Sequence, residues 1–477
     1  MHVPADQMFI AGAWRSARGT LPLEDPSTGE PFGAIARGDA GAVDEAVGAA
    51  RRAFEGDWGG LAPLERGRIL ARMGAIVLRE AETLAALEAR DVGKPLRQAR
   101  ADAVALARYL EFYAGAVDKL HGQTIPYPSD HTVYTLREPH GVTGHIIPWN
   151  YPMQILGRSV GAALAAGNAC VVKPAEEACL TALALGVIAA EAGLPAGALN
   201  IVPGLGEEAG AALAAHPGVD HLSFTGSNAV GTLVQAAAAA HVAPVTLELG
   251  GKSPQIVFAD ADLDRALPFL LNAGIQNAGQ TCSAASRLLI ERPVYEAVLE
   301  ALAARYRALV AAPAAADRDL GPLISAKQKA IVEGFFADAR DLTVAAEGMI
   351  APDAPAGGHY VAARLYRDVP PGHRLAQEEI FGPVQVAIPF DSEEEAVAIA
   401  NSTGFGLVAG VWTRDGGRQM RMARRLRAGQ VFLNTYGAGG GVELPFGGVG
   451  KSGHGREKGF EALYGFTTVK TVAAWHG

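Results

Sequence analysis

The sequence predicts an α/β protein built around a parallel β-sheet with helices on both faces. Three observations support this fold class. Strand and helix patterns alternate from residue 141, they alternate again from about 255 to 435, and the first third of the chain reads as helical. Such alternation is typical of parallel strands joined by crossover helices. Ligands bind open sheets of this kind at the carboxyl ends of the strands.

The individual elements follow from the spacing of apolar residues. Residues 41–54 place apolar side chains at helical spacing opposite charged ones, and residues 63–91 and 95–116 continue that pattern. Residues 131–138 alternate as a strand does, and 464–475 are rich in β-forming residues. In the first alternating region we expect strands at 142–147, 169–172, 199–202, 221–224 and 244–248, and helices at 152–166, 178–192, 206–215 and 228–240.

The composition excludes several classes of protein. The net charge is −9 and no basic block occurs, which argues against nucleic acid and membrane surfaces as partners. The apolar tracts are interrupted before the length of a membrane span, and the start of the chain lacks the pattern of a signal peptide. Three cysteines are too few for a disulfide framework. We therefore expect a cytoplasmic protein.

Cys282 is the candidate nucleophile. It lies among small and polar residues in Asn277-Ala-Gly-Gln-Thr-Cys-Ser-Ala, without an apolar sequence neighbour to bury it. A cysteine in such a setting is accessible and can act as a thiolate. The alternative is an ordinary buried cysteine, which suits Cys170 in a predicted strand and Cys179 in a predicted helix.

Two polar residues stand at predicted strand ends that face the ligand crevice. Glu248 ends the strand 244–248 and precedes two glycines, so it is either a general base or a solvated strand-end charge. Asn150 lies at a strand-to-helix turn. Its side-chain amide can donate a hydrogen bond to an oxyanion, or its side chain can cap the helix.

Three further residues suit a dinucleotide. Lys173 and Glu176 follow a predicted strand, where they can contact ribose hydroxyls, and the carboxylate would disfavour the 2′-phosphate of NADP relative to NAD. The alternative is that Lys173 and Glu176 are a pair at the protein surface that caps the following helix. Ser227 opens a predicted helix whose free N–H groups suit a pyrophosphate, although an ordinary helix cap has the same pattern.

Two glycine patterns resemble nucleotide-binding motifs only superficially. The run from Gly204 to Gly210 is one residue too long for the dinucleotide fingerprint and carries two glutamates. The segment Gly450-Lys-Ser resembles the end of a P-loop, but the first glycine of that motif would fall at Pro445. Neither pattern by itself predicts a phosphate site.

In combination and in order, the motifs resemble the NAD(P)-dependent aldehyde dehydrogenase superfamily over essentially the whole chain. The matching motifs are Pro148-Trp-Asn-Tyr-Pro152, Lys173-Pro-Ala-Glu176, Phe224-Thr-Gly-Ser227, Leu247-Glu-Leu-Gly-Gly-Lys252, Gly279-Gln-Thr-Cys282, Glu378-Glu-Ile-Phe-Gly-Pro383, Pro445-Phe-Gly-Gly448 and Ser452-Gly-His-Gly-Arg-Glu457.

The resemblance implies three parts and a homo-oligomer. A Rossmann-like NAD-binding domain would comprise 1–118 and 140–249, and an α/β catalytic domain 250–450. A small β oligomerisation arm would comprise 119–139 and 451–477. In this layout the arms pair between subunits, which implies a homodimer or a homotetramer.

The resemblance also implies a reaction and its residues, with NAD as the cofactor and no metal. Cys282 resembles the nucleophile that forms a thiohemiacetal and then a thioester, and Glu248 the base that activates water. Asn150 and the backbone N–H of Cys282 resemble the oxyanion site. The implied cofactor contacts are Ile147, Trp149, Lys173, Glu176, Gly206, Ser227, Leu249, Glu379, which would contact the nicotinamide ribose, and Phe381, which would pack beside the nicotinamide.

The chain departs from the family pattern near the substrate. Many members have a lysine at the position of Ser159, in a proposed proton relay with the carboxylate that Glu457 matches. Arg158 stands where a tryptophan is common, and it resembles the arginine of semialdehyde dehydrogenases. It would pair with a substrate carboxylate, or it would be a surface or interface arginine. The expected substrate pocket also includes Tyr151, Thr281 and Ser283.

The loop from Gly437 to Val442 lacks the aromatic residue that often lines the substrate tunnel of the family. We expect a wider mouth that accepts a bulky aldehyde. Two alternatives to NAD-dependent oxidation to the acid stay open. Transfer of the acyl group to coenzyme A would not need Glu248 as a hydrolytic base. The other alternative is a catalytically inactive binding or structural protein on the same scaffold, which would not need Cys282, Glu248 and Asn150 together.

Overall fold

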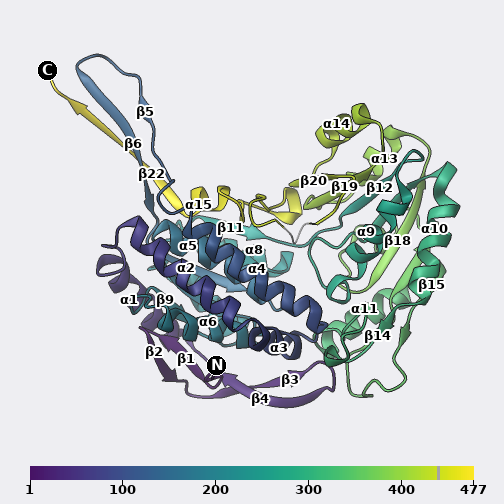
Figure 1. Ribbon diagram of the computed structural model, residues 1–477, viewed down its shortest axis with the longest axis horizontal. Helices are drawn as coiled ribbons and strands as arrows, with labels where there is room; N and C mark the ends of the chain where they lie inside the picture. The colour runs from purple at the N-terminus through teal and green to yellow at the C-terminus, as the bar shows by residue number, and fades with distance from the viewer. Residues whose placement is uncertain (438–440) are drawn as a thin grey trace.

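The computed structural model describes residues 1–437 and 441–477, and two main bodies each contain one large sheet (Figure 1). In the first sheet the strand order is β2-β1-β9-β8-β7-β10-β11-β21. The five central strands run parallel, and the edge strands are antiparallel. The strands are β1 (Gln7–Ile10), β2 (Ala13–Ser16), β7 (Val142–Ile147), β8 (Ala169–Pro174), β9 (Leu199–Ile201), β10 (His221–Thr225), β11 (Val245–Glu248) and β21 (Gly453–His454).

Helices cover both faces of the first sheet. On one face, α5 and α6 pack on the strands. The helices α2, α3 and α4 pack on α5 and α6 and form an outer layer. On the other face lie α1, α7 and α8. The helices are α1 (Ala40–Glu55), α2 (Pro63–Arg79), α3 (Ala81–Val92), α4 (Leu96–Ala114), α5 (Pro152–Ala166), α6 (Leu180–Glu191), α7 (Ala211–Ala215), which a π-turn η1 (Gly206–Gly210) precedes, and α8 (Asn228–Ala239).

The second sheet has the order β15-β17-β18-β13-β12-β19-β20, with all neighbours parallel except β15 and β17. Its strands are β12 (Pro254–Val257), β13 (Arg287–Glu291), β15 (Thr343–Glu347), β17 (Arg364–Arg367), β18 (Val384–Phe390), β19 (Val408–Trp412) and β20 (Gln430–Leu433). The helical segments around it are α9 (Leu263–Ile275), η2 (Gln276–Gly279), α10 (Arg292–Arg307), α11 (Ala326–Asp338), α12 (Arg374–Gln377), α13 (Glu393–Ala400) and α14 (Gly416–Arg425).

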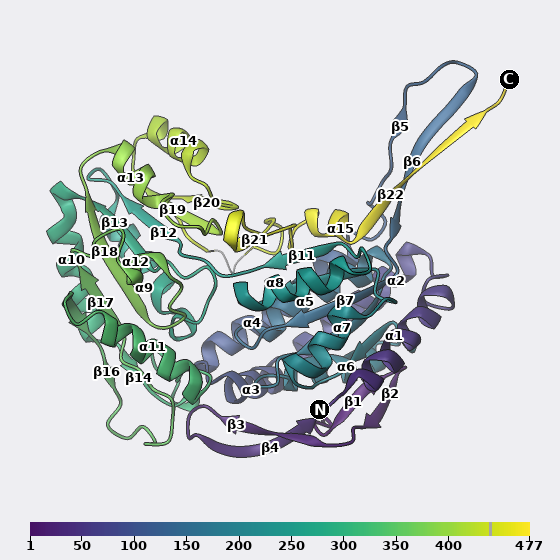
Figure 2. The same cartoon turned by 180° about the vertical axis from the view of Figure 1, so that it is seen from behind.

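A three-stranded antiparallel arm extends away from both bodies, with the C-terminus near its tip (Figures 1 and 2). It consists of β5 (Thr124–Ile125), β6 (His131–Pro139) and β22 (Thr467–Trp475). Within the expected arm segment 451–477, only β22 belongs to this sheet. The strand β21 is an edge of the first sheet, and α15 (Glu461–Gly465) packs against α5. The division into domains stays a prediction.

The α/β fold class is confirmed, but the first third is not purely helical. Two hairpins precede α1: β1 with β2, and β3 (Thr20–Asp25) with β4 (Glu30–Ala36). Short strands are hard to detect by periodicity, and the first hairpin turns at Ala11 and Gly12, which both have positive φ. The expected helix 63–91 is two helices that meet at Glu80. Among the described residues, no helix has the length and apolar character to cross a membrane.

The carboxyl group of Asp91 caps α6 from a neighbouring helix. Its Oδ2 accepts a hydrogen bond from the backbone N–H of Leu180 at 2.9 Å. Cys179, expected inside the helix, is the residue that precedes it and has no side-chain capping bond. Burial raises the pKa of Asp91 from 3.8 to about 7. The helix start that follows β8 is therefore stabilised by a group that titrates near neutral pH.

Asp91→Asn should flatten the pH dependence of stability. The pKa of Asp91 is higher in the folded chain, so folding is most favoured below the unfolded pKa of 3.8. This contribution declines as the pH rises to about 7, by an amount on the order of a few kcal/mol. Urea unfolding at pH 5 and pH 8 should show a smaller decline for Asp91→Asn than for the native chain. Equal declines in the two proteins would show that Asp91 does not titrate as described.

Candidate active site

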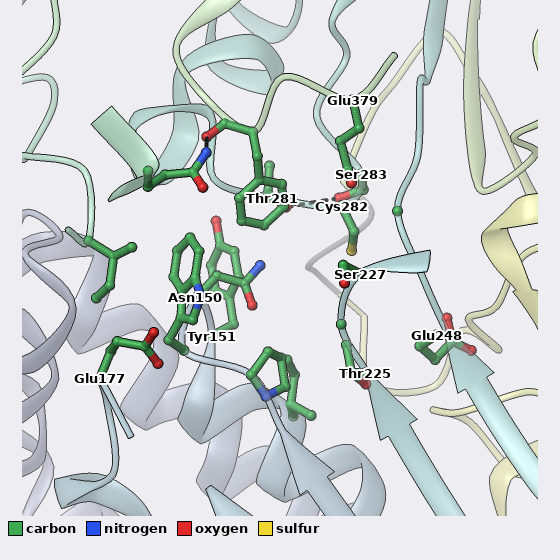
Figure 3. Close-up of a pocket in the computed structure, with 18 of the residues that line it drawn as sticks. Asn150, Tyr151, Glu177, Thr225, Ser227, Glu248, Thr281, Cys282, Ser283 and Glu379 are labelled. Carbon is green, nitrogen blue, oxygen red and sulfur yellow. Dashed lines mark hydrogen bonds between the residues drawn. The ribbon is translucent and has the colours of Figure 1, made fainter. Parts of the chain in front are cut away.

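A cavity of about 460 Å³ lies at the carboxyl ends of β7, β10 and β11 (Figure 3). Loops from the second sheet close its other side, including the segment that carries Cys282. Most of the predicted catalytic and substrate-pocket residues line this one cavity. These are Asn150, Tyr151, Arg158, Glu248, Thr281, Cys282 and Ser283.

The Cys282 loop has an unusual backbone that depends on a glycine. After α9 ends, Asn277, Ala278 and Gly279 all have positive φ values of 49°, 53° and 73°. A Cβ atom on Gly279 would lie 2.0 Å from the carbonyl oxygen of Gly382. Only glycine fits this position, because the backbone of the next loop passes directly beside it. The loop therefore turns back towards the first sheet just before Cys282.

Asn150 is joined to the Cys282 loop by hydrogen bonds in both directions. Its Nδ2 donates to the carbonyl oxygen of Gln280 at 3.1 Å, and Nδ2 of Asn277 donates to the carbonyl oxygen of Asn150 at 3.0 Å. The N-cap residue of α5 is Tyr151, so Asn150 does not cap that helix. An amide nitrogen has two hydrogens, and the second remains for a ligand in the cavity. Figure 3 shows Asn150 and Cys282 facing the same space.

The thiol of Cys282 is less accessible than its sequence neighbours suggest. The side chain is only partly exposed and packs against Leu407 and Phe446, which come from distant segments. Burial raises the pKa of the thiol to about 12, with the positive charge of Arg158 acting in the opposite direction. The sequence neighbours of Cys282 are small and polar as expected, and it is more exposed than Cys170 and Cys179, but the fold brings apolar residues from distant segments against it. The raised pKa favours the neutral thiol.

Glu248 is a buried carboxyl group that faces the cavity. It ends β11, is 1% exposed, and its two oxygens have no hydrogen-bond partner among the described residues. Burial raises its pKa well above the usual value, although Arg158 lowers it in part. The alternative of a solvated strand-end charge is wrong. A carboxylate with a raised pKa is a better proton acceptor than an exposed one.

Arg158 lies in the cavity wall, but its charge is already paired. Its Nε lies 2.5 Å from Oε2 of Glu457, and a terminal nitrogen donates to Thr225 at 3.2 Å. Ser223 donates to the other oxygen of Glu457 at 2.6 Å. Ser159, at the position where a lysine is common, contacts Ser223 at 3.1 Å. Arg158 is therefore not a surface arginine, and Glu457 lies behind it, outside the cavity lining.

The residues expected around the nicotinamide are brought together. The rings of Trp149 and Phe381 meet edge-on with centroids 5.2 Å apart. Oε1 of Glu379 accepts the backbone N–H of Gly251 at 3.0 Å, and burial raises the pKa of this carboxyl to about 7. A Cβ on Gly250 would lie 2.2 Å from Oε2 of Glu379, so a side chain there would displace this carboxyl group.

Of the other expected cofactor contacts, Ser227 lines the cavity and the rest do not. Lys173 and Glu176 lie at the end of β8 and pair with each other at 2.7 Å. Gly206 begins the π-turn, and Ile147 ends β7. Leu249 is buried beside α8. Ser227 lines the cavity and caps α8, so both of its alternative interpretations remain compatible with the structure.

Sequence reasoning missed several lining residues. Gln328 donates to the carbonyl oxygen of Phe381 at 2.9 Å, and Phe381 has a positive φ of 56°. The hydroxyl of Tyr436 donates to the carbonyl oxygen of Ser283. Gln328 lies on α11 and lines the cavity, whereas Tyr436 follows β20 and packs beside Cys282, and neither residue belongs to a motif that the sequence analysis used. Of the expected wide mouth at 437–442, residues 438–440 lie outside the described residues, so that expectation stays a prediction.

Comparisons with known proteins agree with this geometry. A model of the aldehyde dehydrogenase family matches residues 14–472. The chain belongs to the aldehyde dehydrogenase family. Hydroxyisobutyraldehyde dehydrogenase of Mycolicibacterium austroafricanum is 41% identical over 98% of this chain and 93% of its own length.

Two solved structures share the fold. A candidate aldehyde dehydrogenase from Burkholderia cenocepacia is 66% identical, with a TM-score of 0.98 over 99% of this chain and 100% of its own. An NAD⁺ complex of aldehyde dehydrogenase from Bacillus cereus is 39% identical, with a TM-score of 0.96 over 99% of this chain and 97% of its own. The predicted family, fold and class of enzyme, an NAD-dependent aldehyde dehydrogenase, are confirmed.

Alkylation of Cys282 by iodoacetamide should show the high pKa of its thiol. Only the thiolate reacts, so without cofactor the rate constant should rise about tenfold per pH unit from pH 7 to 10 with no plateau. The rate is measured as loss of activity, with peptide mapping to confirm the modified residue. A plateau that begins below pH 8 would mean that the resting thiol is already ionised.

Proposed function

We propose that this enzyme oxidises an aldehyde to the carboxylic acid through a covalent intermediate on Cys282. The observation that carries the proposal is that Cys282, Asn150 and Glu248 all line one buried cavity. An aldehyde has no leaving group other than hydride. The nucleophile, the oxyanion donors and the hydride acceptor must therefore act in the same enclosed space.

The first step is attack of the Cys282 sulfur on the aldehyde carbon. The thiol proton passes to solvent water, a loss that the positive charge of Arg158 favours because it lowers the pKa of the thiol. The C–S bond forms, and the carbonyl oxygen becomes an oxyanion. The second Nδ2 hydrogen of Asn150 and the backbone N–H of Cys282 donate to that oxyanion. Loss of one such donor in other enzymes costs about 3–4 kcal/mol.

The cleft residues suit a bound dinucleotide. When bound, NAD would place a positive charge next to Cys282 and would accept the hydride that leaves the former aldehyde carbon as the oxyanion collapses to the Cys282 thioester. Trp149 and Phe381 would pack around the nicotinamide, and Glu379 would accept hydrogen bonds from its ribose. The start of α8 at Ser227 has free N–H groups for the pyrophosphate. Val230 and Leu233 on α8 are exposed apolar residues that suit the adenine face.

At the far end of the cofactor, Lys173 and Glu176 would contact the adenosine ribose. They form an ion pair in this structure, which keeps a carboxylate where NADP would carry its phosphate. Gly206, Ile147 and Leu249 are the remaining proposed contacts of the cofactor. This arrangement supports a preference for NAD over NADP.

The second half-reaction is hydrolysis of the thioester. Glu248 takes a proton from water, the hydroxide oxygen bonds to the acyl carbon, and the C–S bond breaks to restore Cys282. The alternative, acyl transfer to coenzyme A, is disfavoured because the unpaired carboxyl of Glu248 has a role only if water is the acceptor. Glu457 acts on this step indirectly, because it neutralises Arg158 at 2.5 Å.

For the substrate we propose a bulky aldehyde, with a semialdehyde as the second candidate. Arg158 would recognise the carboxylate of a semialdehyde, but that carboxylate must compete with Glu457 for the guanidinium. Tyr151, Thr281 and Ser283 line the cavity near Cys282 and would contact either substrate.

We propose that the arm joins copies of this chain into a homodimer or homotetramer in the cytoplasm. Val469 and Trp475 on β22, and Leu136 on β6, are exposed apolar residues that a second copy would cover. The arm would comprise 119–139 and β22. The proposed NAD-binding domain remains 1–118 and 140–249, now with β21 at its sheet edge, and the catalytic domain 250–450.

Cys282→Ala should abolish turnover. NADH formation at 340 nm would be followed with aliphatic, aromatic and carboxylated aldehydes, with NAD or NADP, and with or without coenzyme A. The native chain should reduce NAD without coenzyme A, and Cys282→Ala should lose at least 1000-fold in kcat because no covalent intermediate forms. Cys179→Ala is the matched control and should keep native activity. Equal rates for the native chain and Cys282→Ala would end the proposal.

A further inference from the structure

A buried charged cluster lies behind the Asn150 turn, in a part of the chain that the proposed mechanism does not use. Nζ of Lys94 lies 2.7 Å from Oε1 of Glu88 and 2.5 Å from Oδ2 of Asp102. The Lys94 and Glu88 side chains are fully buried, and that of Asp102 is 3% exposed. Glu88 belongs to α3, Asp102 belongs to α4, and Lys94 lies in the turn between them.

Each member of this cluster contacts a residue at the start of α5. The Lys94 ammonium lies 4.2 Å from the ring centroid of Tyr151. The second oxygen of Glu88 accepts the backbone N–H of Met153 at 3.3 Å, and the second oxygen of Asp102 accepts from Nε2 of Gln154 at 2.5 Å. The helix start lacks a side-chain cap of its own, so Glu88 satisfies one of its orphan N–H groups, and Asp102 holds the side chain of Gln154.

The same pair of helices also contacts the Cys282 loop. Oε1 of Gln98, on α4, accepts the backbone N–H of Asn277 at 3.0 Å. Asn277 in turn donates to the carbonyl oxygen of Asn150. The α3–α4 corner therefore contacts the turn on one side of the cavity and the loop on the other.

Buried ion clusters contribute little net stability relative to apolar side chains of the same size. They do fix the relative position of the groups that they bond. Here the groups are the residues that follow Asn150 and the residues that precede Cys282. A charged cluster with no access to substrate fits a positioning role better than a stabilising one.

We propose that Lys94, with Glu88, Asp102 and Gln98, positions the Asn150 amide against Cys282 so that it can bind the oxyanion. These four are positioning residues, because none of them lines the cavity. The inference rests on the proposed role of Asn150 as an oxyanion donor.

A double-mutant cycle tests this proposal. Lys94→Met removes the ammonium and keeps a side chain of similar length, and Gln98→Met removes one hydrogen-bond acceptor on the other side of the cavity. Each should lower kcat at least tenfold in the native background. In an Asn150→Ala background each should lower kcat less than twofold, because the donor that they position is gone. The dissociation constant of NADH, followed by its fluorescence, should stay within twofold.

Arg100→Met is the matched control, because Arg100 lies on the exposed side of α4 and pairs with Glu82 of α3. It should keep native kcat. The proposal is overturned if Lys94→Met and Gln98→Met leave kcat within twofold, or lower it equally with and without Asn150. If Lys94→Met does not fold, the proposal is tested by the double-mutant cycle that combines Gln98→Met, at a half-buried residue, with Asn150→Ala. A native kcat in Asn150→Ala alone would instead refute the proposed oxyanion role.

Discussion

The active site depends on the hydrogen bonds that join the Asn150 turn to the Cys282 loop. Asn150 follows β7 of the first sheet, whereas Cys282 precedes β13 of the second sheet. The bonds between Asn150, Gln280 and Asn277 fix the distance between these two parts. The left-handed backbone at 277–279 is required to make them, and Gly279 is the residue that permits it. These hydrogen bonds hold the nucleophile, which belongs to the second body, against its oxyanion donor, which belongs to the first body.

Burial then sets the protonation of the cavity. It raises the pKa of Cys282 to about 12 and that of Glu379 to about 7, and it raises the pKa of Glu248 as well. The positive charge of Arg158 opposes these shifts, but Glu457 offsets much of that charge. The cavity therefore disfavours the ionised forms of Cys282 and Glu248. The proposed chemistry uses the positive charge of a bound cofactor beside Cys282 to help release the thiol proton, and it uses Glu248 as the base of the hydrolytic step.

Sequence reasoning predicted what depends on local pattern and on ordered motifs. The strand at 142–147 and the helix at 152–166 match the structure residue for residue, because each is an apolar run bounded by turn residues: Pro148 follows the strand, Pro152 begins the helix and Gly167 ends it. The motifs led to Cys282, Glu248 and Asn150, which do share a cavity.

What sequence reasoning missed depends on distant contacts. The pairing of Arg158 with Glu457 joins residues about 300 positions apart, and no local pattern predicts it. Cys282 packs against Leu407 and Phe446, which lie more than 100 positions further along the chain. Lys94 belongs to none of the motifs, yet the fold buries it between two acids. Four strands before α1 were also missed, because β1 and β2 have only four residues each and β3 and β4 contain proline, which is unusual within a strand.

The most direct test of the account is the mass of the intermediate. Glu248→Gln should still form the thioester but lose the base that hydrolyses it, so acyl-enzyme should accumulate when aldehyde and NAD are added. Intact-protein mass spectrometry should then show an increase equal to the aldehyde less two hydrogen atoms, and peptide mapping should locate it on Cys282. The increase should be absent without NAD. An acyl group on another residue, or NADH release by Glu248→Gln with no acyl group on Cys282, would contradict the account.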